Sequence, residues 1–227
     1  MNVKAYVAEF IGTFALIFIG IGVITHLGTA QTGLTGIALG HGFAIACLVS
    51  ATMAVSGGHL NPAVTLGLLV GKKIDALNAV GYIISQIVGA YVAALCAQYV
   101  LPGQSITNVI HGTPALAMGT LPAQGFVAEA IATFFLIFVV YGSAVDRRAH
   151  KVGGLFIGLT IAMGILAIGP LTGAAINPAR WLGPALLTHG FDNWWVWILG
   201  PICGGIVAGL VYTGILEERA PAAEQPA

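Results

Sequence analysis

The sequence contains very few charged residues. Asp, Glu, Lys and Arg make up 7% of its 227 residues, whereas a soluble domain carries about 25%. Apolar residues reach 58%, and so few charges could not cover a water-exposed surface, so a lipid bilayer must form part of the solvent. Eight basic and eight acidic residues give a net charge of zero, which argues against nucleic acid as a partner. The composition indicates an integral membrane protein.

Cysteine is also scarce. The chain holds Cys47, Cys96 and Cys203, each within an apolar run. They are too few and too scattered for a disulfide framework or a zinc site, so we expect them to pack as small hydrophobic residues. We expect no metal and no other cofactor.

Long apolar runs, in contrast, are abundant. A helix that crosses the hydrocarbon needs about 20 apolar residues. The first run resembles a signal peptide because Lys4 precedes it, but Glu9 interrupts it and further runs follow, so we interpret it as a retained helix. The predicted spans are Lys4–His26, Leu34–Val55, Leu77–Val100, Gln124–Ala144, Gly153–Gly169 and Asn193–Leu216.

Two shorter apolar segments, Asn61–Val70 and Asn177–Thr188, each begin with Asn-Pro-Ala. Proline is favoured at the first helical position, and asparagine before it is a favoured N-cap. Both segments therefore predict short helices with abrupt starts. Laid end to end, they would cover about one membrane thickness.

The chain repeats itself. The motif Ala8–Phe14 returns as Ala128–Phe134, and each Asn-Pro-Ala motif has a partner 116 residues away. An odd number of spans in each half requires the second half to be inverted in the membrane. We therefore predict an all-α membrane protein with six transmembrane helices and two half-helices, in inverted repeats over residues 4–100 and 124–216. The paired motifs are Asn61, Pro62 and Ala63, and Asn177, Pro178 and Ala179.

The basic residues predict the orientation. The loops around Gly28–Gly33 and Leu101–Pro122 hold no Lys or Arg, so the positive-inside rule places both termini in the cytoplasm. Short tails favour a prokaryotic plasma (inner) membrane, and residues 220–227 are expected to be disordered. The basic residues on the predicted cytoplasmic side are Lys4, Lys72, Lys73, Arg147, Arg148, Lys151 and Arg219.

The segments Ser56–Thr65 and Thr172–Arg180, with Ala-Glu-x-x-x-Thr-Phe opening each half, resemble the major intrinsic proteins, and among them the aquaporins. The resemblance runs from about Val3 to Leu216. It implies a single channel domain over residues 1–219 and a homotetramer in the lipid bilayer, each protomer with its own pore. It implies passage of water or small neutral solutes and no enzyme activity.

The paired asparagines suggest how protons are excluded. An N-cap side-chain oxygen accepts from its own helix, which leaves an amide NH₂ that only donates. Water between Asn61 and Asn177 would point its oxygen at both, so neighbouring waters orient oppositely and a proton relay is interrupted. Two helix N-termini also repel cations. The alternative is a pair of plain helix caps in a bundle.

A non-helical segment precedes each short helix. Irregular backbone at membrane depth lines a water-filled cavity or packs within protein. The resemblance implies that its carbonyls accept hydrogen bonds from passing water, although His59 is alternatively a packed histidine. These carbonyls belong to Gly57, Gly58, His59, Gly173, Ala174 and Ala175.

Arg180 must face a lumen or a partner. The resemblance places it in the narrowest ring of the pore with His41, Ile165 and Ala174. Strict water channels carry a large aromatic residue and a histidine at the first two of these positions. This ring is closer to that of plant tonoplast intrinsic proteins, some of which also pass ammonia, urea or hydrogen peroxide. His41 is alternatively a helix-packing residue.

Glycerol is disfavoured. Glycerol-conducting members usually have Asp and Lys where Trp181 and Ala185 stand. Alanine matches the water-channel pattern, and tryptophan matches neither group.

Glu9 and Glu129 occupy the same place in both repeats. They are either a proton relay or, as the repetition favours, acceptors for backbone N–H groups of the non-helical segments. An ion-coupled transporter needs ionisable groups at the midplane, where asparagines lie, and an intramembrane hydrolase lacks a recognisable catalytic arrangement. The sequence predicts a passive, proton-excluding water channel. The alternatives are a broader channel that also passes ammonia, hydrogen peroxide or urea and, less favoured, an ion-coupled secondary transporter.

Overall fold

The computed structural model describes residues 2–27, 33–149 and 152–218. These residues form helices joined by loops, with no strand among them. Six helices are long and apolar enough to cross a membrane, which confirms the predicted spans. Residues 220–227, the predicted disordered tail, lie outside the described part. The spans are α1 (Val3–Leu27), α2 (Gly33–Ser56), α4 (Ala76–Val100), α6 (Pro122–Val140, extended by the π-helical turn Tyr141–Val145), α7 (Gly153–Thr172) and α9 (Trp195–Val211, extended by Tyr212–Leu216).

The two half-helices are α3 (Pro62–Val70) and α8 (Pro178–Thr188). Asn61 and Asn177 cap them with extended backbone, and each side-chain oxygen accepts from the backbone N–H two residues on, at 2.8 and 2.9 Å. Proline occupies the first helical position of both. The start of each half-helix is therefore as the Asn-Pro-Ala motif predicts.

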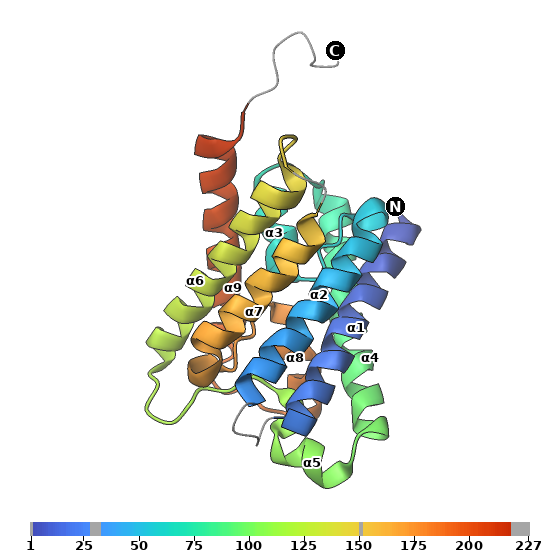
Figure 1. The fold of residues 1–227 in the computed structure, drawn as a ribbon, viewed down its shortest axis with the longest axis vertical. Helices are drawn as coiled ribbons and strands as arrows, with labels where there is room; N and C mark the ends of the chain where they lie inside the picture. Colours follow the sequence, from blue (N-terminus) through green and yellow to red (C-terminus); the bar gives the residue numbers. More distant parts are fainter. Residues whose placement is uncertain (1, 28–32, 150–151, 219–227) are drawn as a thin grey trace.

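The helices pack as an inverted repeat. Helix α1 packs against α4 as α6 packs against α9, and the counterparts α2 and α7 pack against each other between the halves. Each half-helix crosses over, α3 onto α9 and α8 onto α4. Figure 1 shows α3 and α8 in opposite halves along the bundle, and the start of α1 at the same end as the end of α9. Each repeat therefore holds the half-helix of the other.

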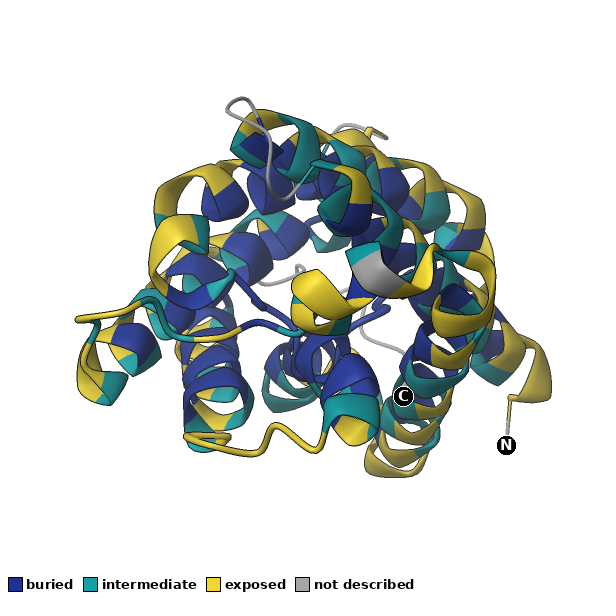
Figure 2. Cartoon of the chain, turned by 90° about the horizontal axis from the view of Figure 1, so that it is seen from below, coloured by how far each residue is buried: buried dark blue, intermediate teal, exposed yellow. Residues whose placement is uncertain are grey.

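The outward faces of the spans are apolar. Exposed side chains include Phe43, Phe135 and Phe156, and Figure 2 shows exposed residues on the outside of the bundle and buried ones inside. Where α2 meets α7, a Cβ on Gly158 would lie 2.3 Å from the carbonyl oxygen of Gly42. Glycine there permits the close helix crossing, as is common between membrane helices.

The loop from Leu101 to Leu121 contains structure that the sequence does not predict. A short helix, α5 (Gly103–Asn108), is followed by a 3-10 turn, Ile110–Gly112. Figure 1 shows α5 at the end of the bundle opposite the start of α1. The loop folds back over this end and approaches the site described below.

Candidate functional site

A narrow cavity lies between the two repeats. Its volume is about 30 Å³, which is room for about two water molecules. Gly57 and Gly173 are not among its described lining residues; with φ of 85° and 76° they turn the chain after α2 and α7, so their carbonyl role stays a prediction. The predicted site residues that line the cavity are His41, Gly58, His59, Asn61, Ile165, Ala174, Ala175, Asn177 and Arg180.

The two capping asparagines bind each other's repeat. Asn61 Nδ2 donates to the carbonyl of Ile176 at 2.9 Å, and Asn177 Nδ2 donates to that of Leu60 at 2.9 Å. One N–H of each amide therefore fastens the half-helices together. The second N–H remains to donate into the cavity. The sequence predicts that the whole NH₂ of each asparagine faces solute, whereas the structure shows that one of its two N–H groups is used in this reciprocal bond.

Two buried carboxylates hold the non-helical segments. Glu9 accepts from the backbone N–H groups of His59 and Leu60 at 2.9 and 2.6 Å. In the second repeat, Glu129 accepts from the backbone N–H groups of Ala175 and Ile176 at 2.9 and 2.7 Å. Both are fully buried, and neither is among the described residues that line the cavity. The sequence predicts these hydrogen bonds. The position of the two carboxylates away from the cavity lining argues against a proton relay.

The held segments are strained. Leu60 and Ile176 have φ of 51° and 55°, a left-handed conformation that is uncommon for residues other than glycine and rarest for a β-branched residue such as Ile176. The N–H of each is bound by a carboxylate and the carbonyl by an asparagine of the other repeat. Such conformations persist where the surroundings fix them on several sides. The four hydrogen bonds supply that restraint.

Two hydroxyl residues complete this arrangement. Ser56 donates to Glu9 at 2.6 Å and accepts from the N–H of Gly58 at 3.1 Å. Thr172 donates to Glu129 at 2.7 Å and accepts from the N–H of Ala174 at 3.0 Å. This role is not among the sequence predictions. A signal for it exists, because each hydroxyl residue directly precedes a glycine and the two pairs are 116 residues apart, the offset of the repeat.

The four predicted ring residues are all buried and all line the cavity. Nδ1 of His41 lies 2.8 Å from the carbonyl oxygen of Ile37. Because a carbonyl oxygen can only accept, Nδ1 must donate, and Nε2 of a neutral ring is then an acceptor. Arg180 Nη1 donates to the carbonyl of Gly112 at 2.9 Å. Gly112 belongs to the unpredicted loop turn, and no motif in the sequence points to it.

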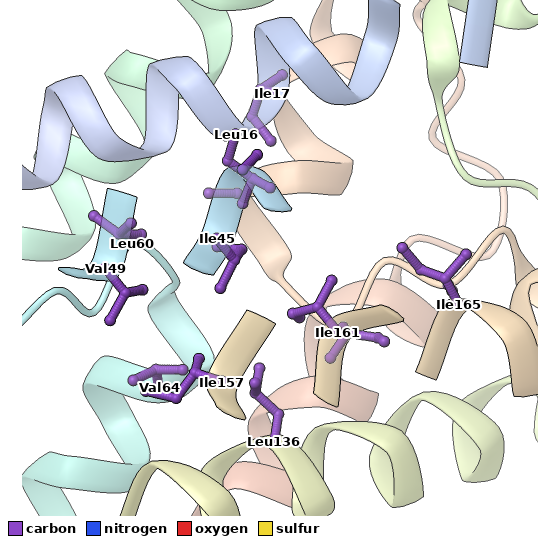
Figure 3. Close-up of a cluster of buried hydrophobic side chains, with 14 of the residues drawn as sticks. Leu16, Ile17, Ile45, Val49, Leu60, Val64, Leu136, Ile157, Ile161 and Ile165 are labelled. Carbon is purple, nitrogen blue, oxygen red and sulfur yellow. The ribbon is translucent and has the colours of Figure 1, made fainter. Parts of the chain in front are cut away.

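The repeat generates a second set of four positions. The offset that relates the asparagines also relates His41 to Ile157, and it relates the other ring members to valine or glycine. All four counterparts line the same cavity, and Figure 3 shows the side chains of three of them, Val49 of α2, Val64 of α3 and Ile157 of α7, in the same region as Leu136 of α6. The two polar members of the predicted ring, His41 and Arg180, therefore have apolar counterparts. The counterparts are Val49, Gly58, Val64 and Ile157.

Comparison with known proteins agrees with this geometry. The model of a family described as "Major intrinsic protein" matches residues 1–212. The chain is 41% identical to Aquaporin TIP2-3 of Zea mays, over 93% of this chain and 87% of that protein. It is 38% identical to Probable aquaporin TIP2-2 of Arabidopsis thaliana, over 97% of this chain and 91% of the relative.

The chain belongs to the major intrinsic protein family. A solved major intrinsic protein, the aquaglyceroporin from Plasmodium falciparum, superposes with a TM-score of 0.86 at 26% identity, covering 95% of this chain and 97% of that one. The family likeness inferred from the paired motifs is therefore confirmed, as is the six-helix fold with two half-helices.

Proposed function

We propose that this major intrinsic protein is a passive water channel that does not conduct protons. The observation that carries the proposal is the pair of N-cap asparagines, Asn61 and Asn177, which line one narrow cavity with one free N–H each. A water between them accepts from both and donates to neither, so the chain of donors reverses there. Relatives at about 40% identity that are named aquaporins support it.

Charge along the cavity supports passive transport. Its ionisable lining residues in the described chain are His41, His59 and Arg180, without Asp, Glu or Lys. The fixed guanidinium and the two helix N-termini repel cations. The described lining thus holds no carboxylate or lysine that could carry a coupled proton, and Nδ1 of each histidine is already hydrogen-bonded, to the carbonyl of Ile37 and the hydroxyl of Thr65, which favours a channel over a coupled transporter or an enzyme.

A second candidate is a broader channel for ammonia, hydrogen peroxide or urea. Its support is the ring itself, which combines His41, Ile165 and Ala174 with Arg180 and has no large aromatic residue. Glycerol is disfavoured, because Trp181 and Ala185 replace the Asp and Lys of glycerol-conducting relatives. The relatives named aquaporins are also more similar in sequence than the aquaglyceroporin.

The assembly is proposed as a homotetramer of single-domain protomers (residues 1–219) in the plasma membrane, with both termini cytoplasmic. Two contacts support the orientation: Lys73 pairs with Glu217 at 2.5 Å, and Arg148 donates to the carbonyl of Leu216 at 3.1 Å. Basic loop residues thus lie at the end of the bundle where α9 finishes, which the positive-inside rule assigns to the cytoplasm. Cross-linking in intact membranes tests the tetramer. Fractionation and protease access to a C-terminal tag test the membrane and the orientation.

Stopped-flow light scattering on proteoliposomes separates the two candidates. Water, ammonia, urea and glycerol are applied as separate challenges. We expect fast water flux, measurable ammonia flux and glycerol near the level of empty vesicles. Ammonia flux equal to that of empty vesicles beside high water flux would exclude the broader channel and leave a strict water channel.

A further inference from the structure

Trp181 follows Arg180 directly and is 1% exposed. It is not among the described residues that line the cavity, and its indole N–H has no hydrogen-bond partner in the described part of the chain. A large ring is therefore buried immediately behind the ring arginine without using its polar atom. Its contribution must come from packing.

The packing partner is Trp197 of α9. The two indole rings stack with centroids 5.5 Å apart and planes at 9°, a geometry in which aromatic pairs attract beyond their buried area. They form a small buried cluster with Ala175 of the non-helical segment. The stack thus joins α8, which carries Arg180, to α9 and to the segment that lines the cavity.

Trp197 also binds the backbone at the end of α7. Its Nε1 donates to the carbonyl of Thr172 at 3.0 Å, and the hydroxyl of Thr172 accepts from the N–H of Ala174 at 3.0 Å. Ala174 has a left-handed φ of 46°, which only a fixed surrounding maintains. The chain of contacts runs from Trp181 through Trp197 and Thr172 to a ring residue.

We propose that Trp181 is a specificity-determining positioning residue. By stacking on Trp197, it holds Ala174 and Arg180 at a fixed separation across the ring and so sets the largest solute that passes. The inference rests on the proposed function only in that the cavity must conduct. Trp181 touches no solute and acts through the two ring members.

The test is the ratio of urea to water permeability in proteoliposomes. Trp181→Ala removes the stack, and we expect the ratio to rise severalfold because Ala174 and Arg180 are then no longer held at a fixed separation. Trp181→Phe retains a flat ring that can stack on Trp197 and loses the smaller part of the indole with its unpartnered N–H, so its ratio should stay close to that of the wild type. Trp197→Phe also retains a ring but loses the bond to Thr172, so its ratio should rise.

The two Trp→Phe variants make the test independent of whether Trp181→Ala folds, since each keeps an aromatic ring at the buried site and removes much less volume than alanine does. Equal ratios in Trp181→Phe and Trp197→Phe would overturn the inference, as would a folded Trp181→Ala with the wild-type ratio. Tyr212→Ala is the matched control, because it removes one ring of a buried stack, 5.2 Å from Tyr141, that contributes no cavity-lining residue. It should lower stability and leave the ratio unchanged.

Failure of the inference is distinguishable from failure of the proposed function. Wild-type protein that does not raise water permeability contradicts the channel itself. Wild-type protein that conducts water, with Trp181→Ala unchanged in its urea ratio, contradicts only the positioning role.

Discussion

Gly20 of α1 determines how much room the His41 ring has beside the cavity. A Cβ at Gly20 would lie 2.5 Å from His41 Nε2, closer than any non-bonded contact allows, so Gly20→Ala should push the imidazole into the narrow pore. We expect osmotic water permeability to fall severalfold. Gly22→Ala is the control, because a Cβ there meets nothing within 4 Å. Equal permeability in the two variants would contradict this placement of His41.

Ala174 provides a second probe of the ring. Cys47 and Cys203 are exposed and Cys96 is half-buried, and none is among the described residues that line the cavity. Mercurials, which attack thiols, should therefore leave wild-type water flux nearly unchanged. Ala174→Cys should become strongly blocked and recover with a reducing thiol. Strong mercurial block of the wild type that persists in Cys47→Ser would contradict the prediction that no native cysteine lies at the pore.

At this scale the sequence predicts the residues that carry a local signature. Asn61, Asn177 and Arg180 are recognisable because capping, proline and a lone intramembrane charge are features of short motifs. Gly20 and Gly112 are not predictable in this way. Their roles arise from contacts with residues far along the chain, and glycine in a membrane helix or loop has many ordinary reasons to occur.

Among the elements, the entry to α8 depends on Glu129. Its two oxygens accept from Ala175 and Ile176 and from Thr172, and a glutamine has one acceptor oxygen and an NH₂ that would face an N–H group. We expect Glu129→Gln to lower the free energy of unfolding by about 1–3 kcal/mol and to reduce water permeability.

Glu217→Gln is the matched acid-to-amide control, since it affects a partly exposed pair with Lys73. Such surface pairs contribute about 0–1 kcal/mol. Thermal unfolding in detergent and water flux per reconstituted protein measure both effects. If Glu129→Gln behaves like this control, the carboxylate does not maintain the strained segment.

The spans and half-helices follow from the sequence because apolar length and N-caps are local properties. Helix α5 (Gly103–Asn108) and the turn Ile110–Gly112 do not, since six and three residues are too few for a periodic signal. The apolar counterpart of the ring also requires the structure, because it depends on which side chains face one cavity.

At the scale of the whole molecule, a clasp of hydrogen bonds joins the segment after α6 to the end of α9. Arg148 donates to Asp146 at 2.9 and 2.6 Å and to the carbonyl of Leu216 at 3.1 Å, and Tyr212 donates to Asp146 at 2.9 Å. The hydrogen bonds from Arg148 hold the pKa of Asp146 well below its usual range. The carboxylate is thus charged in the folded protein through neutral and mildly acidic pH.

This shift predicts the sign of a pH dependence. Because the folded pKa lies below the unfolded value of about 3.9, the stabilisation is complete above that value and is lost as the pH falls below it. The Tm difference between wild type and Asp146→Asn should therefore stay constant from pH 7 to pH 5 and shrink in stronger acid. A difference that already disappears between pH 7 and pH 5 would contradict the clasp.

Conduction of water without conduction of protons can be tested in a single reconstitution. Proteoliposomes that contain a pH-sensitive dye receive an osmotic step and, separately, a pH gradient with a potassium–valinomycin clamp. We expect shrinkage much faster than in empty vesicles and proton flux equal to that of empty vesicles. Shrinkage no faster than in empty vesicles, or proton flux that rises with the amount of protein, would contradict the account.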